Sequence, residues 1–297
     1  MKFTYKKSRR YGISQYIKYL LFLSMTKKST SLFIRGGDVI STGPILGAEH
    51  ESFFCDFLRY CSKTNGDYLL DIGANIGLIS CQVGNNFNQL DLVEPNPIVQ
   101  NILKSNLIMS FDKSKYKIHD FGLGTSDDRL TLKVPKHNFG GAFIKEGNSY
   151  NEKLLATKDG FEHIDENNYL ETSVLIKNAN VFFQDIFNSY IASNRFNGII
   201  KIDVEGYEKP ILDAIKKTLP SELNVIICFE NHDTNFDLGG FLSNFDREIK
   251  VYKLTSGRFD NNNPIRNRIK HLLYGWVYSL VPIDNSSLVG DLVIDIK

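Results

Sequence analysis

The sequence predicts an α/β domain built on a mostly parallel sheet. Apolar runs with the length of buried strands recur along the middle of the chain, as in DYLLDIG (67–73) and NGIIKIDVEG (197–206). Segments with apolar residues at helical spacing lie between such runs, for example IVQNILKSNLIMS (98–110). Strands that alternate with helices are joined by right-handed crossovers, which bring the strands side by side in parallel.

Five strands are expected in this part of the chain. Their sequences are DYLLDIG (67–73), QLDLVEPNP (89–97), YKIHDFGLG (116–124), NGIIKIDVEG (197–206) and LNVIICFENH (223–232). Helices are expected over 75–87, 98–110 and 208–218. Residues 126–180 do not follow this alternation of strands and helices, and their pattern predicts a hairpin-like excursion or lid. Residues 249–297 predict the last two strands, with a helical insertion at about 262–286.

The charge is distributed unevenly, although the net charge is only +1. Residues 1–37 contain nine Lys or Arg and no acid. We therefore expect a basic N-terminal extension over 1–48, followed by the main domain over 49–297. Within the extension, residues 13–25 predict an amphipathic helix, because Lys18 interrupts an apolar stretch far shorter than the roughly 20 residues that span a bilayer. This helix packs on the domain or lies on an anionic membrane surface, and the sequence leaves both interpretations open.

The cysteines indicate a reducing compartment. Cys55, Cys61, Cys81 and Cys228 form no CxxC pair, and three of them have apolar neighbours. Buried thiols fit this pattern better than a disulfide framework or a zinc site. We expect a cytoplasmic protein, with the inner face of a membrane as a second location.

The turn after the first strand has the features of a nucleotide-binding loop. Gly73 and Gly77 lie between the strand and its helix, where a missing side chain lets a ligand approach backbone N–H groups. Asp71 ends the strand, and Glu94 ends the next one about 20 residues later. An acid at that position accepts hydrogen bonds from ribose hydroxyls in nucleotide-binding sheets.

Two common nucleotide motifs are absent. No GK[ST] follows the glycines, and Ala74 and Asn75 break the G-x-G-x-x-G fingerprint of dinucleotide sites. A cationic methyl donor, which has a ribose and an adenine but no phosphate, fits the acidic loop better.

Several motifs in this order resemble the FkbM-type family of S-adenosylmethionine-dependent methyltransferases. They are LLDIGANIGLIS, LVEPNP, GLGTSDDRLTLKVP, FGGAFI and IIKIDVEGYE, within residues 68 to about 235. The resemblance implies a class I methyltransferase fold, a Rossmann-like three-layer sandwich. Its sheet has seven mostly parallel strands, the last of them antiparallel. Members of this family are mostly similar to O-methyltransferases that act on hydroxyls of sugars or polyketides.

The resemblance also implies the donor site. Glu94 would hold the ribose hydroxyls, and Asn96, Asp120 and Gly122 would lie near the adenine. The family often has a small residue such as Ala before the Leu or Ile at this point, and this chain has Gly122 instead. The expected adenine contacts therefore differ from the usual family pattern. The full set of expected cofactor-binding residues is Asp71, Gly73, Asn75, Gly77, Glu94, Asn96, Asp120, Gly122 and Asp203.

Methyl transfer to an alcohol also needs a base. The fourth strand ends at Asp203 and Glu205, and the fifth ends at Glu230 and His232. Strand alternation predicts that both pairs face one cleft. His232 is the first choice for the base and Asp203 the second, because a carboxylate can orient an imidazole and stabilise its charged form.

Plainer roles compete with these assignments. Glu205 and Glu208 also suit the positive end of the following helix. A plainer role for His232 is that of a strand-end residue whose ring nitrogens are hydrogen-bonded to solvent. A plainer role for Lys201 is an ion pair with a neighbouring acid. Asp203, Glu205, Glu230 and His232 offer the hard ligands of a divalent metal, but the resemblance requires none and no metal site is predicted.

The sequence thus favours an S-adenosylmethionine-dependent O-methyltransferase for a hydroxyl of a glycan, lipid-linked sugar or similar small molecule. One alternative is a domain that binds the donor without turnover. Another is a nucleic-acid methyltransferase, but no [DN]PP[YFW] motif occurs at the fourth strand. We therefore expect no nucleic-acid partner.

Overall fold

A computed structural model provides the structure of the chain. It describes residues 49–148, 150, 152–158, 164–232, 238–242, 247–257, 265–266, 268–269, 277–283 and 289–297, with residues 17, 20, 21, 32–36, 38 and 44.

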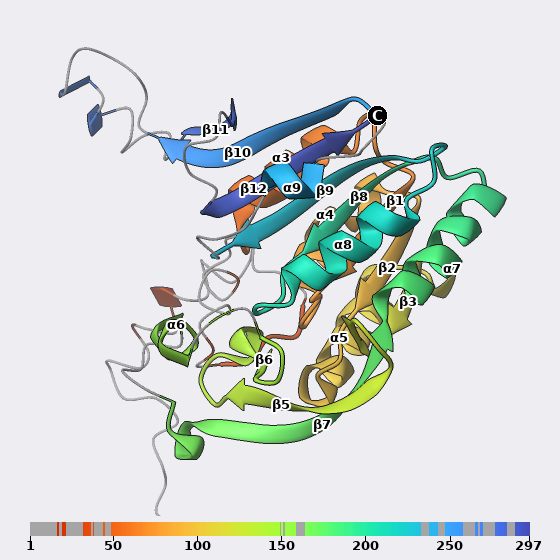
Figure 1. Cartoon of the computed structure of the whole chain (residues 1–297). Helices are drawn as coiled ribbons and strands as arrows, with labels where there is room; N and C mark the ends of the chain where they lie inside the picture. Colours follow the sequence, from red (N-terminus) through yellow and green to blue (C-terminus); the bar gives the residue numbers. More distant parts are fainter. Residues whose placement is uncertain are drawn as a thin grey trace, which may run out of the picture.

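The main sheet of the described chain has eight strands (Figure 1). In spatial order they are β11 (Val277–Pro282), β10 (Ile249–Gly257), β12 (Gly290–Ile296), β9 (Asn224–Asn231), β8 (Asn197–Ile202), β1 (Tyr68–Ile72), β2 (Gln89–Val93) and β3 (Tyr116–His119). From β9 to β3 all neighbouring strands are parallel. The last strand of the chain, β12, is antiparallel to both of its neighbours. This is the class I methyltransferase architecture.

The expected strand count of seven is wrong by one. The additional strand, β11, lies within the segment 262–286 for which the sequence predicts a helical insertion, and it pairs with the edge of β10. Its sequence, VYSLVP, contains the β-branched and aromatic residues that favour a pleated edge over a helix. The four described residues at 265–266 and 268–269 are helical, and the rest of 258–276 lies outside the described residues.

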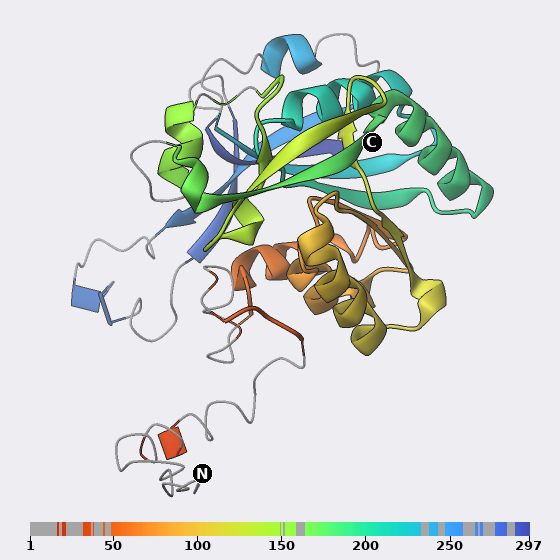
Figure 2. The ribbon, with the colours of Figure 1, turned by 90° about the horizontal axis from the view of Figure 1, so that it is seen from below.

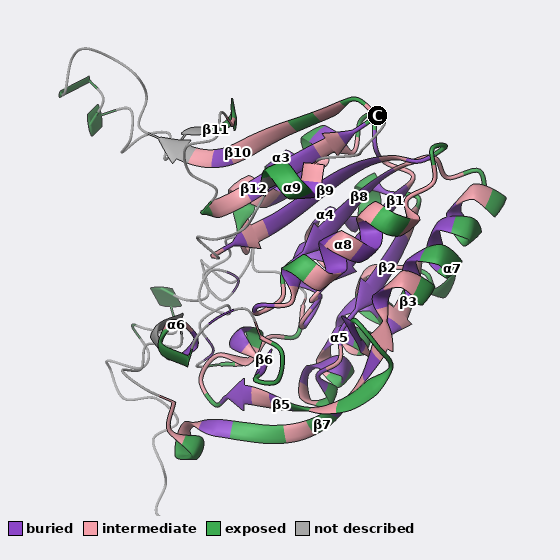
Figure 3. Ribbon diagram, in the orientation of Figure 1, coloured by how far each residue is buried: buried purple, intermediate pink, exposed green. Residues whose placement is uncertain are grey.

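Helices cover both faces of the sheet (Figures 1 and 2). The helices α3 (Ser52–Cys61), α4 (Leu78–Val83) and α5 (Pro97–Ser110) pack on one face, and α7 (Ala179–Ala192) and α8 (Glu208–Thr218) on the other. Successive strand residues point to opposite faces, so Leu69 packs with α3 to α5 whereas Leu70 packs with α7 and α8. All five residues of β1 are buried (Figure 3). The remaining helical segments are α6 (Glu152–Lys158), α9 (Leu238–Leu242), η2 (Gly84–Asn86), η3 (Lys113–Lys115), η4 (Phe139–Gly141) and η5 (Glu166–Asn168).

A second, four-stranded sheet lies beside the carboxyl ends of the main strands (Figures 1 and 2). Its order is β4 (Gly122–Gly124), β7 (Tyr169–Asn178), β5 (Asp128–Pro135) and β6 (Phe143–Ile144). The long β5 and β7 pair antiparallel, from Asp128 opposite Ile176 to Pro135 opposite Tyr169. The segment 126–180, expected as an excursion or lid, therefore supplies three of these strands and places β6 near the ends of β1 and β8.

Most of the N-terminal extension lies outside the described residues, including most of the helix expected over 13–25. Of that helix, Ile17, Leu20 and Leu21 are described, and each is helical and exposed. No helix in the described part of the chain has the length and apolarity needed to cross a bilayer.

One testable consequence concerns the start of α7. The Asn178 side chain accepts hydrogen bonds from the N–H groups of Asn180 and Val181, and its amide donates to the Thr125 carbonyl. Replacing Asn178 with Ala removes this cap and should lower the free energy of unfolding by about 1–2 kcal/mol. Urea denaturation measures the loss as a lower midpoint at an unchanged slope. Gln184→Ala, an exposed change on the same helix, should stay within about 0.5 kcal/mol, and equal losses in the two variants would contradict the capping role.

Candidate functional site

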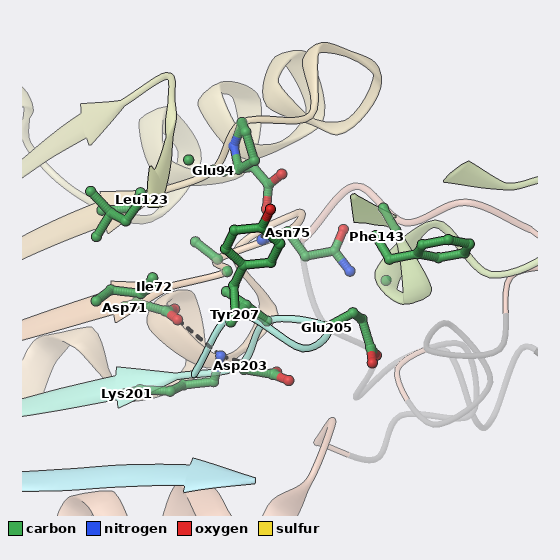
Figure 4. Close-up of a pocket in the computed structure, with 18 of the residues that line it drawn as sticks. Asp71, Ile72, Asn75, Glu94, Leu123, Phe143, Lys201, Asp203, Glu205 and Tyr207 are labelled. Atoms are coloured by element: carbon green, nitrogen blue, oxygen red, sulfur yellow. Dashed lines mark hydrogen bonds and ion pairs between the residues drawn. The ribbon is translucent and has the colours of Figure 1, made fainter. Parts of the chain in front are cut away.

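A cavity of about 250 Å³ opens at the carboxyl ends of β1, β2 and β8 (Figure 4). The turn after β1, the exit of β2 and the exit of β8 form one side of it. The second sheet closes the other side with residues from β4, β6 and η4. Residues 67–124 and 197–208 thus meet at the position where open α/β sheets bind ligands.

A buried lysine connects the ends of β1 and β8. Asp71 and Lys201 lie opposite each other in the strand pairing, and Lys201 Nζ is 3.0 Å from Asp71 Oδ1 and 3.1 Å from Asp203 Oδ2. The Ser80 hydroxyl donates to the other oxygen of Asp71 at 2.6 Å. Burial alone would lower the pKa of Lys201, but Asp203 and Asp71 raise it above its ordinary value, so the ammonium stays charged.

This arrangement fits the expected pairing of Lys201 and leaves Asp203 accessible. The side chains of Lys201 and Asp71 are 5% and 1% exposed, whereas that of Asp203 is 54% exposed. Figure 4 shows the three charged groups side by side along the cavity. Asp71 is therefore fully engaged by the protein, and Asp203 presents its carboxylate to the cavity.

The two glycines of the first turn are required by packing within the protein. Gly73 has φ +81°, and a Cβ there would lie 1.8 Å from the Asp203 carbonyl oxygen. Gly77 has φ +79°, and a Cβ there would lie 2.7 Å from a methyl group of Leu103. The sequence predicts that both glycines let a ligand approach the backbone. The structure shows in addition that the packing of the protein leaves no room for a side chain at either position. Gly73 also lines the cavity.

Glu94 organises the opposite rim of the cavity. Its carboxylate accepts the Asn75 N–H at 2.7 Å and the Asn96 N–H at 2.8 Å, and the residue is buried. Burial raises the pKa of this carboxyl to about 7, although the two backbone N–H groups act in the opposite direction. The acid therefore titrates close to neutral pH.

Asn75 leaves one acceptor without a partner. Its backbone is left-handed, with φ +50°, and its side chain lies beside the cavity (Figure 4). Within the described part of the chain, the buried Oδ1 atom has no hydrogen-bond partner. Buried acceptors without a partner are rare in folded proteins, and this one lies beside the cavity, where a bound molecule has access to it.

The structure separates the three residues expected near the adenine. Gly122 lines the cavity together with Leu123. Asn96 is the N-cap of α5, where its side chain accepts the Ile98 N–H at 3.0 Å, and it is absent from the described cavity lining. Asp120 is exposed and is also absent from that lining. Only Gly122 of the three therefore borders the candidate donor space.

A second cavity of about 220 Å³ adjoins the first, and both are lined by Glu51, Lys201 and Asp203. Glu230 and Asp291 add two more carboxyl groups to its wall. Burial, and then the nearby Glu230 and Asp203, raise the pKa of Asp291. The rings of Phe53 and Phe54 provide an apolar part of the same wall.

The candidate bases are distributed over the two cavities. Asp203 borders both, Glu205 borders the first and Glu230 borders the second. His232 Nε2 lies 2.8 Å from Glu230 Oε1, and its ring packs edge-on against Tyr150. His232 is not among the described lining residues of either cavity, and its neighbour Glu230 lines the second one.

Sequence reasoning missed several residues that line the first cavity. Tyr207 and Phe143 occupy opposite sides of it (Figure 4), and His50 and Glu51 border it from the start of α3. Tyr207 lies within the quoted IIKIDVEGYE motif, so the motif itself contained its signal. His50 and Glu51 lie in no motif, and only the tertiary packing of α3 brings them to the site.

No group of three or more His, Cys, Asp or Glu side chains in the described chain is arranged to hold a metal ion. The strand-end acids and His232 therefore lie near one another without forming a recognisable coordination sphere.

Comparison with known proteins gives a family match. The model of the methyltransferase FkbM domain matches residues 71–257. No curated protein matches the chain. Among solved structures, the precorrin-6Y C5,15-methyltransferase from Geobacter metallireducens is similar at 12% identity, over 82% of this chain and 87% of that one, with a TM-score of 0.37.

Two other solved structures give similar values. An S-adenosylmethionine-dependent O-methyltransferase from Thermotoga maritima has 12% identity, over 83% of this chain and 63% of that one, with a TM-score of 0.37. An rRNA methylase from Streptococcus thermophilus has 9% identity, over 84% of this chain and 95% of that one, with a TM-score of 0.35. Their substrates differ, and similarity at this level says nothing about the substrate of this chain.

The buried lysine provides a stability test of the site. Lys201→Met leaves the Asp71 carboxylate buried beside an apolar side chain, and we expect a loss of about 3 kcal/mol in the free energy of unfolding. Denaturant titration at neutral pH measures it. The matched control is Lys177→Met, which breaks an exposed pair with Asp127 at 3.4 Å and should cost less than about 1 kcal/mol. A Lys201 variant as stable as this control would rule out the proposed electrostatic link between β1 and β8.

Proposed function

Because the chain belongs to the FkbM methyltransferase family and so uses S-adenosylmethionine, we propose that it transfers the donor's methyl group to a hydroxyl oxygen. The proposed acceptor is a glycan, a lipid-linked sugar or a similar small molecule. The observation that carries the proposal is that Asp203 borders both adjoining cavities. A donor in one cavity and an acceptor in the other would meet at this carboxylate.

The residues of the first cavity fit the donor. Glu94 has a buried carboxylate that would accept hydrogen bonds from ribose hydroxyls. The unpartnered Oδ1 of Asn75 would accept a hydrogen bond from the donor's ammonium group. Leu123 and Ile76 offer apolar contacts to an adenine ring, and Asp71 and Asp203 make the cavity favourable for positive charge.

The second cavity fits a polyhydroxylated acceptor. Glu51, Glu230 and Asp291 offer carboxyl oxygens, which accept hydrogen bonds from hydroxyl groups. Phe53 and Phe54 would pack against the apolar face of a sugar ring. This combination of acceptors and aromatic surface supports an alcohol substrate.

The proposed base is the Glu230–His232 pair. When bound, the donor supplies a methyl group activated by its positively charged sulfur. Glu230 borders the acceptor cavity and would accept the hydroxyl proton, which neutralises its carboxylate, and His232 Nε2, 2.8 Å from Glu230 Oε1, would share that proton. Asp203, which is already paired with Lys201, is the second candidate and would orient the acceptor oxygen. The described wall of β6 and η4 helps to exclude water from the reacting atoms.

The proposed reaction is tested by incubating the chain with S-adenosylmethionine and a panel of free and lipid-linked saccharides. The expected result is release of S-adenosylhomocysteine together with a saccharide heavier by one methylene unit. Donor binding without any methylated saccharide would favour the alternative of a binding domain. Methylated RNA or DNA in a parallel reaction would favour a nucleic-acid substrate.

Donor binding should depend on pH through Glu94. The raised pKa of about 7 means that the free protein holds a proton on Glu94 below that pH. Ribose hydroxyls donate to the ionised form, so S-adenosylhomocysteine should bind more tightly as the pH rises from 6 to 8, with release of a proton. Glu94→Gln should weaken binding by about 10- to 100-fold at pH 8 and flatten this dependence.

Calorimetry in two buffers of different ionisation enthalpy measures both the affinity and the proton release for Glu94. An affinity that rises equally with pH in the wild type and in Glu94→Gln would exclude Glu94 as the titrating group.

The base assignment is tested by kinetics. Glu230→Gln and His232→Ala should each lower kcat by about 100-fold or more, with little change in the affinity for S-adenosylhomocysteine. His137→Ala, at a residue that is not among the described lining residues of either cavity, is the control and should retain activity. If His232→Ala turns over at the wild-type rate, the pair is not the base and Asp203→Asn becomes the decisive variant.

A further inference from the structure

We propose that Asn148 is a positioning residue that fastens one wall of the donor cavity to the exit of β8. The proposal rests on the proposed function, because it assigns the first cavity to the donor. Two loops are involved. The wall loop comprises the described residues 143–148 and Tyr150, and the exit loop comprises residues 203–208.

Both loops contribute to the same cavity from different sheets. Phe143 and Ile144 of the wall loop line it, and so do Asp203, Glu205 and Tyr207 of the exit loop. Figure 4 shows both loops beside the cavity, with Phe143 in the wall loop and Asp203 and Glu205 in the exit loop. Any movement between the loops would therefore change the shape of the donor space.

The Asn148 side chain joins the loops directly. Its Nδ2 group donates to the Ile144 carbonyl and to the Glu205 carbonyl, each at 2.7 Å. Its Oδ1 atom accepts the Tyr150 N–H at 2.8 Å. The amide thus binds two points of its own loop and one point of the exit loop, which fixes its orientation.

The exit loop is shaped to receive this amide. Gly206 has φ +85°, and a Cβ at this position would lie 1.9 Å from Asn148 Oδ1. Only glycine adopts this backbone freely and leaves the space that the amide occupies. In the wall loop, Gly147 has φ +70°, and a Cβ there would lie 3.2 Å from the hydroxyl of Tyr207, which is a tight contact.

Two tyrosines reinforce the contact on either side of Asn148. The Tyr207 hydroxyl donates to the Glu146 carbonyl, so the exit loop also bonds to the wall loop. The Tyr150 hydroxyl donates to Glu208 Oε1 at 3.0 Å, at the first residue of α8. Both tyrosine contacts connect the second sheet to the strand–helix unit that carries Asp203 and Glu205.

Asn148 touches neither cavity in the described lining, so its effect on the reaction is indirect. With the amide in place, the wall stays against the exit loop and the donor is held. Without it, the Glu205 carbonyl loses a donor and the wall separates more readily from β8. The donor then leaves faster, and water reaches the reacting atoms more often.

The test compares three variants of the full chain with S-adenosylhomocysteine as the probe. Asn148→Ala removes the amide, and Tyr207→Phe removes the flanking hydroxyl while keeping the ring. Asn167→Ala is the matched control, because that exposed amide bonds only to the neighbouring Asp165 in the described structure. Stopped-flow displacement measures the dissociation rate, and hydrogen exchange of the protein without ligand measures how often the backbone of the wall loop opens.

We expect Asn148→Ala to dissociate the probe about tenfold faster and to exchange faster in the wall loop and the exit loop. Tyr207→Phe should change both measurements in the same direction, and Asn167→Ala should change neither. If Asn148→Ala has the same hydrogen-exchange rates and the same probe dissociation rate as the wild type, the proposal is overturned. If the wild-type chain fails to bind the probe, the proposed function fails, whereas the exchange comparison still decides whether Asn148 fastens the loops.

Discussion

The buried ammonium of Lys201 is the constraint on which the site depends. Asp71 and Lys201 occupy paired positions of neighbouring strands, and Asp203 lies two residues after Lys201, just beyond the end of β8. An unpaired charge in such a place would be strongly unfavourable, so the three groups fix one another. They hold β1 and β8 in register at their carboxyl ends, where the turn after β1 must pass within contact distance of the Asp203 backbone. Gly73 is the residue that permits this close passage.

Around this link, the same residues serve the fold and the proposed chemistry. Glu94 holds the backbone of Asn75 and Asn96 and so joins the first turn to the start of α5. The carboxylate that would grip a ribose thus also sets the shape of the rim. Asp203 neutralises Lys201 and still faces both cavities.

The sequence predicted the parts of the fold that depend on local pattern. The parallel strands β1, β2, β3, β8 and β9 follow from apolar periodicity, although the third predicted strand, 116–124, is divided between β3 of the main sheet and β4 of the second sheet. Gly73, Glu94 and Asp203 border the first cavity because their places at strand ends are set by that pattern. Asn96 was expected near the adenine, but its position directly before Pro97 makes it a helix cap.

The rest depended on tertiary contacts between distant segments. The edge strand β11 pairs with β10, to which it is joined through a long intervening segment, so its place in the sheet depends on a contact between separate parts of the chain. The second cavity brings together α3, β8, β9 and β12, whose residues share no sequence motif. Asn148 likewise has no sequence signal, since its role comes from an exit loop 57 residues away.

A crystal structure of the chain with S-adenosylhomocysteine tests the central claim most directly. The account predicts the nucleoside in the cavity between β1, β2 and β8, with its ribose hydroxyls bonded to Glu94 and its sulfur facing Asp203. A ligand bound elsewhere, or a cavity that stays closed by side chains at saturating ligand, would contradict it.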